Sequence, residues 1–169
     1  MRPGRSKEQP KSPPGGADVL LIEDDPHDAE LTIDALKRCG LIYCEHVSDG
    51  PEALDYLACT GIFVNRYPFY PKLIVLDLHL QKMSGLHVLR QLKSDERTKR
   101  IPIVALTSSK LLIELAESYQ LGVNSYIIKP QDAKIYADRV SDIAYYWLVV
   151  NEPPPTEAQP FRPASFKSA

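Results

Sequence analysis

The segment Leu73-Ile-Val-Leu-Asp77 joins four consecutive apolar residues to a final carboxylate. A short run that is apolar at every position, rather than at alternate positions, is typical of a strand covered on both faces of a parallel sheet. Three further runs have this character, at residues 18–23, 101–106 and 125–128, and a weaker one lies at 43–48. The sequence therefore predicts five strands.

Amphipathic segments follow these runs. Pro26 suits a first helical turn, and Ala29, Ile33 and Leu36 then recur at helical spacing until Gly40. Comparable patterns follow the other four runs, at residues 53–57, 84–92, 111–120 and 132–151. Five strands that alternate with five helices give a doubly wound α/β fold, a parallel sheet with helices on both faces. In such folds the chemistry lies at the carboxyl ends of the strands.

Polar residues follow the strands where that chemistry is expected. Glu23 and Asp24 end the first strand, Asp77 the third, Thr107 the fourth and Lys129 the fifth. Clustered carboxylates hold a cation or shift one another's pKa, and hard oxygen ligands suit Mg²⁺. A carboxylate can also attack phosphorus, while a lysine and a metal ion stabilise the transferred charge. These residues predict phosphoryl transfer to Asp77. The sequence lacks the glycine-rich phosphate loop that would indicate a nucleotide-binding domain.

Four strings in this sequence resemble the receiver domains of two-component response regulators. They are Val19-Leu-Leu-Ile-Glu23-Asp24-Asp25-Pro26, Leu73-Ile-Val-Leu-Asp77-Leu-His-Leu-Gln-Lys-Met-Ser-Gly85, Ile103-Val-Ala-Leu-Thr107-Ser108 and Ser125-Tyr-Ile-Ile-Lys129-Pro130. The resemblance covers residues 17–151. It implies a flavodoxin-like sheet with the strand order 2-1-3-4-5.

The resemblance also implies a phosphorylation site. Asp77 matches the phosphoacceptor, Glu23 and Asp24 match the acidic pair, and Asp24 is the direct ligand of Mg²⁺. The main-chain carbonyl of His79 is expected to complete the metal contacts of the protein. The protein itself is then a phosphoacceptor rather than an enzyme, apart from self-phosphorylation by small donors and autodephosphorylation.

Further family roles fall on the last two strands. Thr107 matches the switch hydroxyl, Tyr126 the aromatic switch and Lys129 the family's lysine, and the bond to Pro130 is expected to be cis. Ser84 stands where many members have aspartate, a departure that leaves the chemistry intact.

The last helix resembles that of single-domain regulators paired with cyanobacterial and bacterial phytochromes. That resemblance implies a sensor histidine kinase of the phytochrome type as phosphodonor, and a homodimer formed through the last helix. Residues 143–150 are apolar or aromatic on every side of the expected helix. Packing one face of this helix on the sheet would bury only part of them, so the others would form an exposed apolar patch. The expected dimer seam consists of Tyr136, Val140, Ile143, Trp147 and Val150. The alternative is that the proline-rich tail folds back over this patch.

Composition sets the remaining expectations. The chain has three scattered cysteines and shows neither a signal peptide nor a run of about 20 apolar residues, so we expect a cytoplasmic protein that does not bind membranes. Its 169 residues carry a net charge of −2, and acids outnumber bases from 17 to 151, so direct binding of nucleic acid is not expected. Residues 1–16 are expected to be a disordered leader, 17–151 the receiver domain and 152–169 a proline-rich tail. A tail this short and proline-rich is not expected to fold into a DNA-binding domain, so the output is protein contact or phosphate relay.

Two other functions remain open. An aspartyl-phosphate phosphatase of the haloacid dehalogenase type would require a second acid two residues after the nucleophile, where this chain has His79. A degenerate receiver that serves only as a constitutive binding scaffold would be expected to lack part of the set of acids, threonine and lysine. Detection of a stable phosphate on Asp77, and of substrate turnover, would separate these functions.

Overall fold

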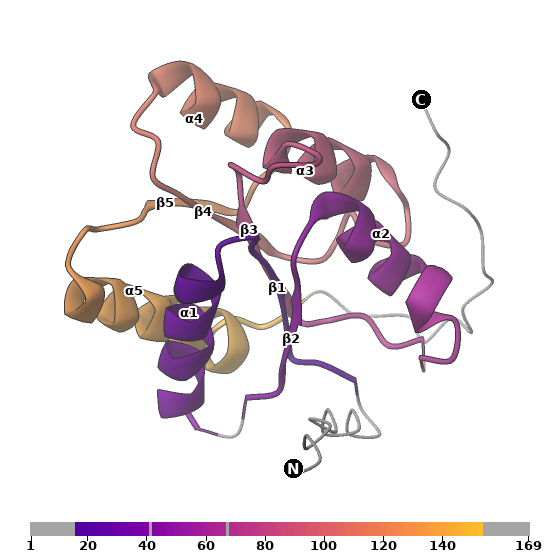
Figure 1. The fold of residues 1–169 in the computed structure, drawn as a ribbon, viewed down its shortest axis with the longest axis horizontal. Helices are drawn as coiled ribbons and strands as arrows, with labels where there is room; N and C mark the ends of the chain where they lie inside the picture. The colour runs from indigo at the N-terminus through magenta and orange to yellow at the C-terminus, as the bar shows by residue number, and fades with distance from the viewer. Residues whose placement is uncertain (1–15, 41, 67, 154–169) are drawn as a thin grey trace, which may run out of the picture.

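The computed structural model describes residues 16–40, 42–66 and 68–153, and they form one parallel sheet between two layers of helices (Figure 1). The strand order is β2-β1-β3-β4-β5, and every neighbouring pair is parallel. The strands are β1 (Val19–Ile22), β2 (Cys44–Val47), β3 (Leu73–Asp77), β4 (Ile103–Thr107) and β5 (Ser125–Ile128). The predicted fold class and strand order are confirmed. Apart from their inner ends, the predicted leader and tail lie outside the described residues.

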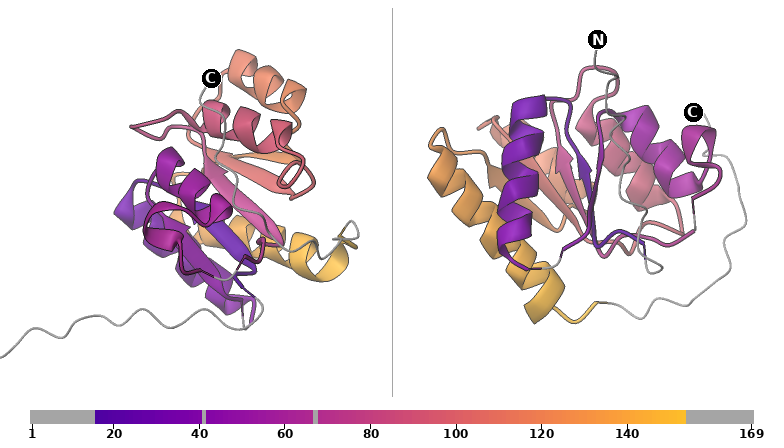
Figure 2. Two further views of the ribbon diagram at one scale, coloured as in Figure 1. Left: turned by 90° about the vertical axis from the view of Figure 1, so that its right-hand side faces the viewer. Right: turned by 60° about the horizontal axis from the view of Figure 1, so that its bottom comes forward.

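Five α-helices connect and cover the strands. They are α1 (Pro26–Arg38), α2 (Gly50–Ala58), α3 (Gly85–Ser94), α4 (Leu112–Gln120) and α5 (Ala133–Tyr145), with a 3₁₀ turn at Gly61–Phe63. Helices α1 and α5 pack side by side on one face of the sheet, and α2 and α3 cover the other face (Figures 1 and 2). None of the described helices is both long and apolar enough to cross a membrane.

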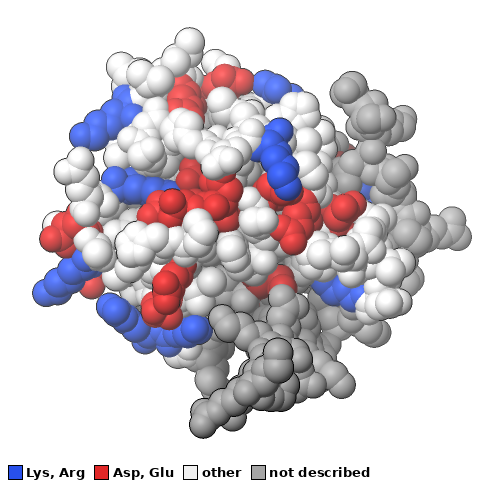
Figure 3. All heavy atoms as spheres, viewed as in Figure 1, with Lys and Arg blue, Asp and Glu red and all other residues white. Residues whose placement is uncertain are grey.

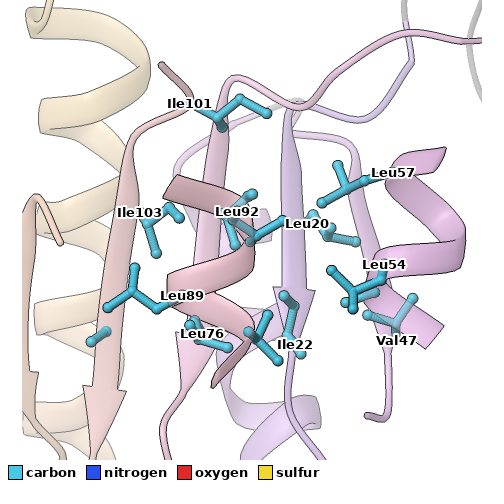
Figure 4. Packing of buried hydrophobic residues seen from close by; sticks show 14 of the residues in the cluster. Leu20, Ile22, Val47, Leu54, Leu57, Leu76, Leu89, Leu92, Ile101 and Ile103 are labelled. Carbon is cyan, nitrogen blue, oxygen red and sulfur yellow. The ribbon is translucent and has the colours of Figure 1, made fainter. Parts of the chain in front are cut away.

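Two apolar cores hold these layers together. Alternate residues of the central strands point to opposite faces, so Leu20 and Ile22 of β1 join one core while its Val19 and Leu21 join the other. In the first core, residues of α2 and α3 such as Leu57 and Leu89 point at the strands (Figure 4). The buried strands therefore need apolar residues at every position, which explains the continuous runs in the sequence.

Gly85 sets how closely α3 approaches the end of β3. Its N–H donates to the carbonyl of Leu78 at 2.9 Å. A Cβ atom at Gly85 would lie 2.3 Å from the main-chain oxygen of Asp77, closer than any real contact. Only glycine allows this approach, so Gly85 fixes the start of α3 against the residue that carries the predicted phosphoacceptor.

The last helix differs from its predicted form in two respects. Its α-helical turns end at Tyr145, and Tyr146–Val150 continue as a π-helix, closed by the Asn151 N–H donating to the Tyr146 carbonyl at 2.7 Å. Tyr136 and Val140 are only 4% and 2% exposed, because this side of α5 packs on α1 and the sheet. The prediction that these two residues belong to a dimer seam is therefore wrong.

Candidate functional site

The carboxyl ends of β1 and β3 bring three carboxylates together. Ile22 of β1 lies opposite Leu76 of β3, so the residues that follow them, Glu23 and Asp77, are neighbours across the sheet. Carboxylate oxygens of Glu23, Asp24 and Asp77 lie within 4.8 Å of one another. Acidic side chains gather at the centre of this face of the molecule (Figure 3). Three converging hard oxygen ligands, two of them on buried residues, fit a divalent cation such as Mg²⁺ or Mn²⁺.

Main-chain N–H groups orient each of these acids. The N–H of His79 donates to Asp77 Oδ1 at 2.8 Å, and the N–H of Asp25 donates to Glu23 Oε1 at 3.1 Å. The N–H of Gln81 donates to Asp24 Oδ2 at 3.1 Å. Each of the three carboxylates therefore accepts one bond from a main-chain N–H, which orients the cluster.

Lys129 supplies the positive charge of the site. Its ammonium lies 2.7 Å from Asp77 Oδ2, 2.7 Å from Glu23 Oε2 and 2.8 Å from Asp28 Oδ2, and the side chain is 10% exposed. Burial alone would lower the pKa of Lys129, but the charge of Asp77 and the bonds to all three carboxylates outweigh it and raise the pKa. The lysine is therefore charged, and each of its three N–H donors has an acceptor.

Glu23 is the acid most affected by this crowding. It is 1% exposed, and burial, reinforced by the charge of Asp77, raises the pKa of Glu23 from 4.5 to about 7 despite the opposing effect of Lys129. At neutral pH, protonated and ionised forms of Glu23 therefore coexist when no cation is bound. The site favours an added positive charge, because a cation would relieve the repulsion between Glu23 and Asp77.

We expect this shift to make the stability of the metal-free protein depend on pH. Between pH 4.5 and about 7 folded Glu23 holds a proton that the unfolded chain has lost, so the free energy of unfolding falls as pH rises. The stability that Glu23 contributes is fully present below pH 4.5 and is lost by about pH 7. The free energy of unfolding changes by up to about 3 kcal/mol over this range. Urea unfolding with a chelator, at a series of pH values, measures it.

The matched variants are Glu23→Gln and Glu30→Gln. Glu23→Gln should remove most of the slope in this pH window, while Glu30→Gln changes an exposed acid on α1 and should keep it. An unchanged slope in Glu23→Gln would contradict the shifted pKa of Glu23.

The end of β4 connects the site to α4. Asp77 lies opposite Leu106 of β4, which places the fully buried Thr107 one residue further along. Its hydroxyl lies 3.2 Å from His79 Nδ1 and accepts a bond from the Ser109 N–H at 3.1 Å. His79 Nε2 in turn lies 3.4 Å from Glu114 Oε1 in α4. A chain of polar contacts therefore leads from the predicted switch hydroxyl to α4.

Tyr126 lies beside this chain. It is partly buried against the core, and its hydroxyl donates to the main-chain oxygen of Ser109 at 3.5 Å. Ser109, in the loop after β4, thus contacts both Thr107 and Tyr126, the two residues that the resemblance identifies as switch residues.

The structure brings most of the predicted site residues together. Glu23, Asp24, Asp77 and Lys129 form one cluster, and Thr107 adjoins it through His79. Their individual roles, and the role of the His79 carbonyl as a metal ligand, stay predictions. The cis bond expected at Pro130 is wrong, because no described peptide bond is cis, in line with the ordinary preference for trans.

Sequence reasoning missed two residues of the site, Asp28 and Glu114. Asp28 lies in the first turn of α1, four residues after Asp24, so its closeness to the acidic pair along the chain is a usable signal. Glu114 has no such signal, because the chain separates it from the other site residues and only the fold brings it to His79.

Comparisons with known proteins agree with this geometry. Residues 19–140 match the family model of the response regulator receiver domain. The chain is 38% identical over 137 residues to the probable methanogenesis regulatory protein FilR2 of Methanothrix harundinacea, covering 80% of this chain and 86% of FilR2. It is 35% identical over 134 residues to the response regulator Rcp1 of Synechocystis, covering 77% of this chain and 88% of Rcp1.

Solved structures show the same likeness. The phosphorylated cyanobacterial phytochrome response regulator RcpA aligns with a TM-score of 0.77 at 35% identity, covering 82% of this chain and 99% of RcpA. The Mn²⁺-bound form of Rcp1 aligns with a TM-score of 0.73 at 34% identity, covering 82% of this chain and 99% of that one.

Proposed function

The chain belongs to the family of response regulator receiver domains, and on that premise we propose that it is a stand-alone response regulator that accepts a phosphoryl group on Asp77. The phosphodonor is a sensor histidine kinase. The observation that carries the proposal is the ammonium of Lys129, bonded at 2.7 Å to a carboxylate oxygen of Asp77 inside an acidic cluster. This arrangement unites a nucleophile with positive charge at the place where phosphoryl charge would develop.

The residues of the chain have distinct parts in the transfer. A carboxylate oxygen of Asp77 forms the new bond to phosphorus while the phosphorus–nitrogen bond of the kinase phosphohistidine breaks, and the freed imidazole keeps that electron pair and takes up a proton. Lys129 stabilises the negative charge on the phosphoryl oxygens. Glu23, Asp24, Asp77 and the carbonyl of His79 would hold Mg²⁺, which offsets further phosphoryl charge. The Mn²⁺-bound form of Rcp1 supports a divalent site.

The kinase is proposed to be a phytochrome. The support is the likeness to RcpA, which is described as a cyanobacterial phytochrome response regulator. Because histidine kinases charge their histidine from ATP, we place this exchange in the cytoplasm.

The proposed output is a change in protein contacts. A phosphoryl group on Asp77 would draw the hydroxyl of Thr107 away from His79, and the loop that carries Ser109 and contacts Tyr126 would follow. That loop leads into α4, so the surface around α4 and β5 changes.

A homodimer through the end of the last helix is part of the proposal. Ile143, Trp147 and Val150 remain from the predicted seam, and Val149 and Tyr145, 66% and 59% exposed, extend the apolar surface there. A second copy that covers this surface would remove apolar area from water.

The test is to incubate the wild-type protein with a small phosphodonor, such as acetyl phosphate, and Mg²⁺. Intact mass should increase by one phosphoryl group per chain, a phosphate-affinity gel should show a shifted band, and a chelator should prevent both. Size exclusion of the same samples reports whether the phosphate changes assembly. The absence of any phosphoryl group on folded protein with Mg²⁺ would overturn the proposal and favour a binding scaffold.

A further inference from the structure

The three carboxylates that bind Lys129 have different roles in the proposed function, on which this inference rests. Asp77 becomes an acyl phosphate and loses its own carboxylate charge. Glu23 belongs to the acidic cluster that would hold the cation. Asp28, 2.8 Å from the ammonium, lies outside both the reacting group and that cluster. It is therefore the one described acceptor of Lys129 that neither phosphorylation nor metal binding engages.

The main chain holds Asp28 firmly in place. Its N–H donates at 2.9 Å to the side chain of Asp25, the residue that caps α1. Its carbonyl accepts a bond from the hydroxyl of Thr32 at 2.8 Å, and that hydroxyl lies 2.6 Å from the hydroxyl of Tyr136 in α5. Thr32 and Tyr136 are both buried where α1 packs on α5. The packing of these two helices thus fixes the main chain of Asp28, from which its carboxylate contacts Lys129.

We propose that Asp28 is a positioning residue that holds the Lys129 ammonium beside Asp77 throughout phosphoryl transfer. A lysine side chain has a flexible four-carbon stem and a compact charge, so its ammonium needs fixed acceptors to stay at one point. Once the Asp77 carboxylate has become an acyl phosphate, and with Glu23 in the cluster that would hold the cation, Asp28 keeps the ammonium in place. One N–H of Lys129 then passes from Asp77 to a phosphoryl oxygen while the nitrogen itself hardly moves.

This role makes Asp28 separable from the metal site. Asp28 contacts Lys129 and is no member of the Glu23, Asp24 and Asp77 cluster. Its replacement should slow phosphorylation at saturating Mg²⁺ and saturating phosphodonor, while the affinity for Mg²⁺ stays the same. A residue needed only for folding would lower the thermal midpoint and affect both quantities together.

The experiment compares Asp28→Asn, Asp28→Glu and Asp34→Asn with the wild type. For Asp28→Asn we expect the maximal rate of phosphorylation by acetyl phosphate to fall about tenfold, as a loss of about 1.4 kcal/mol gives. Asp28→Glu keeps the charge and should recover part of the rate. Asp34→Asn removes an acid of α1 that pairs with Lys37 on the surface, and should leave the rate unchanged.

A second measurement does not depend on the reaction rate. The ammonium signal of Lys129 in NMR spectra of protein loaded with Mg²⁺ and beryllofluoride, a phosphoryl mimic, should be protected from exchange in the wild type. Asp28→Asn should lose this protection.

Each outcome is decisive. An unchanged or faster maximal rate in Asp28→Asn, or a protected Lys129 signal in that variant, would overturn the positioning role. A wild type that takes up no phosphate would instead sink the proposed function itself.

Discussion

Asp77→Asn is expected to take up no phosphoryl group under conditions in which the wild type is phosphorylated fully. An amide lacks the anionic oxygen that attacks phosphorus, so the reaction has no nucleophile at this position. The change should not unfold the protein, because Asp77 shares Lys129 with two other acids and its charge contributes to raising the pKa of Glu23. Intact mass and a phosphate-affinity gel, with circular dichroism as the folding check, measure this.

The matched control is Asp49→Asn. Asp49 and Asp77 are each 7% exposed, but Asp49 caps α2 and pairs with Lys82, outside the cluster of Glu23, Asp24 and Asp77. Asparagine also caps helices well, so this variant should fold and keep its phosphorylation. A phosphoryl group that persists in Asp77→Asn would move the acceptor to another acid, and peptide mapping would identify it.

Much of the fold could be predicted because the three central strands, β1, β3 and β4, are buried on both faces. Burial requires apolar residues without interruption, so the bounds of β3 follow directly from the run 73–77. The cluster could be predicted for a related reason. Adjacent parallel strands end at one edge of the sheet, so residues such as Glu23 and Asp77, which follow those runs, must meet.

The last helix could not be predicted as well, because it is apolar on more than one side. The spacing of Tyr136, Val140 and Ile143 marks a helical stripe but does not reveal what covers it. In the structure the first two residues pack within the chain, where Ala137 and Ala144 widen the same buried face. The switch to a π-helix after Tyr145 is a change in main-chain hydrogen bonding, and no residue type in the sequence marks it.

The partners of Lys129 likewise could be predicted only in part from the sequence. Sequence position places Glu23 and Asp77 at strand ends, whereas Asp28 lies in the first turn of α1 and contacts the lysine because of where that helix packs on the sheet. The motifs that define the family thus identify the groups that react. The helices that cover the sheet decide how those groups are oriented, and this depends on packing that spacing alone does not encode.

Lys129→Met is expected to destabilise the metal-free protein at neutral pH by about 3–5 kcal/mol, the usual cost of removing one partner from buried charges. Methionine fills a similar volume, but Glu23 and Asp77 lose their shared positive charge in a site with little access to water. Mg²⁺ should reduce this deficit, because a cation at Glu23, Asp24 and Asp77 replaces part of the missing charge. Urea unfolding with Mg²⁺ and with a chelator measures both effects.

Low pH should also reduce the loss of stability in Lys129→Met, because Glu23 becomes protonated. Without Lys129, which opposes the rise, the pKa of Glu23 should increase beyond about 7, so the carboxyl becomes neutral more readily. Lys82→Met is the matched control, since Lys82 also pairs with a buried acid, Asp49, but is itself 72% exposed. It should cost far less than Lys129→Met, because water already solvates the exposed lysine, and it should respond equally with and without Mg²⁺. A deficit in Lys129→Met that neither Mg²⁺ nor acid reduces would show that the lysine stabilises the protein by some means other than neutralising this cluster.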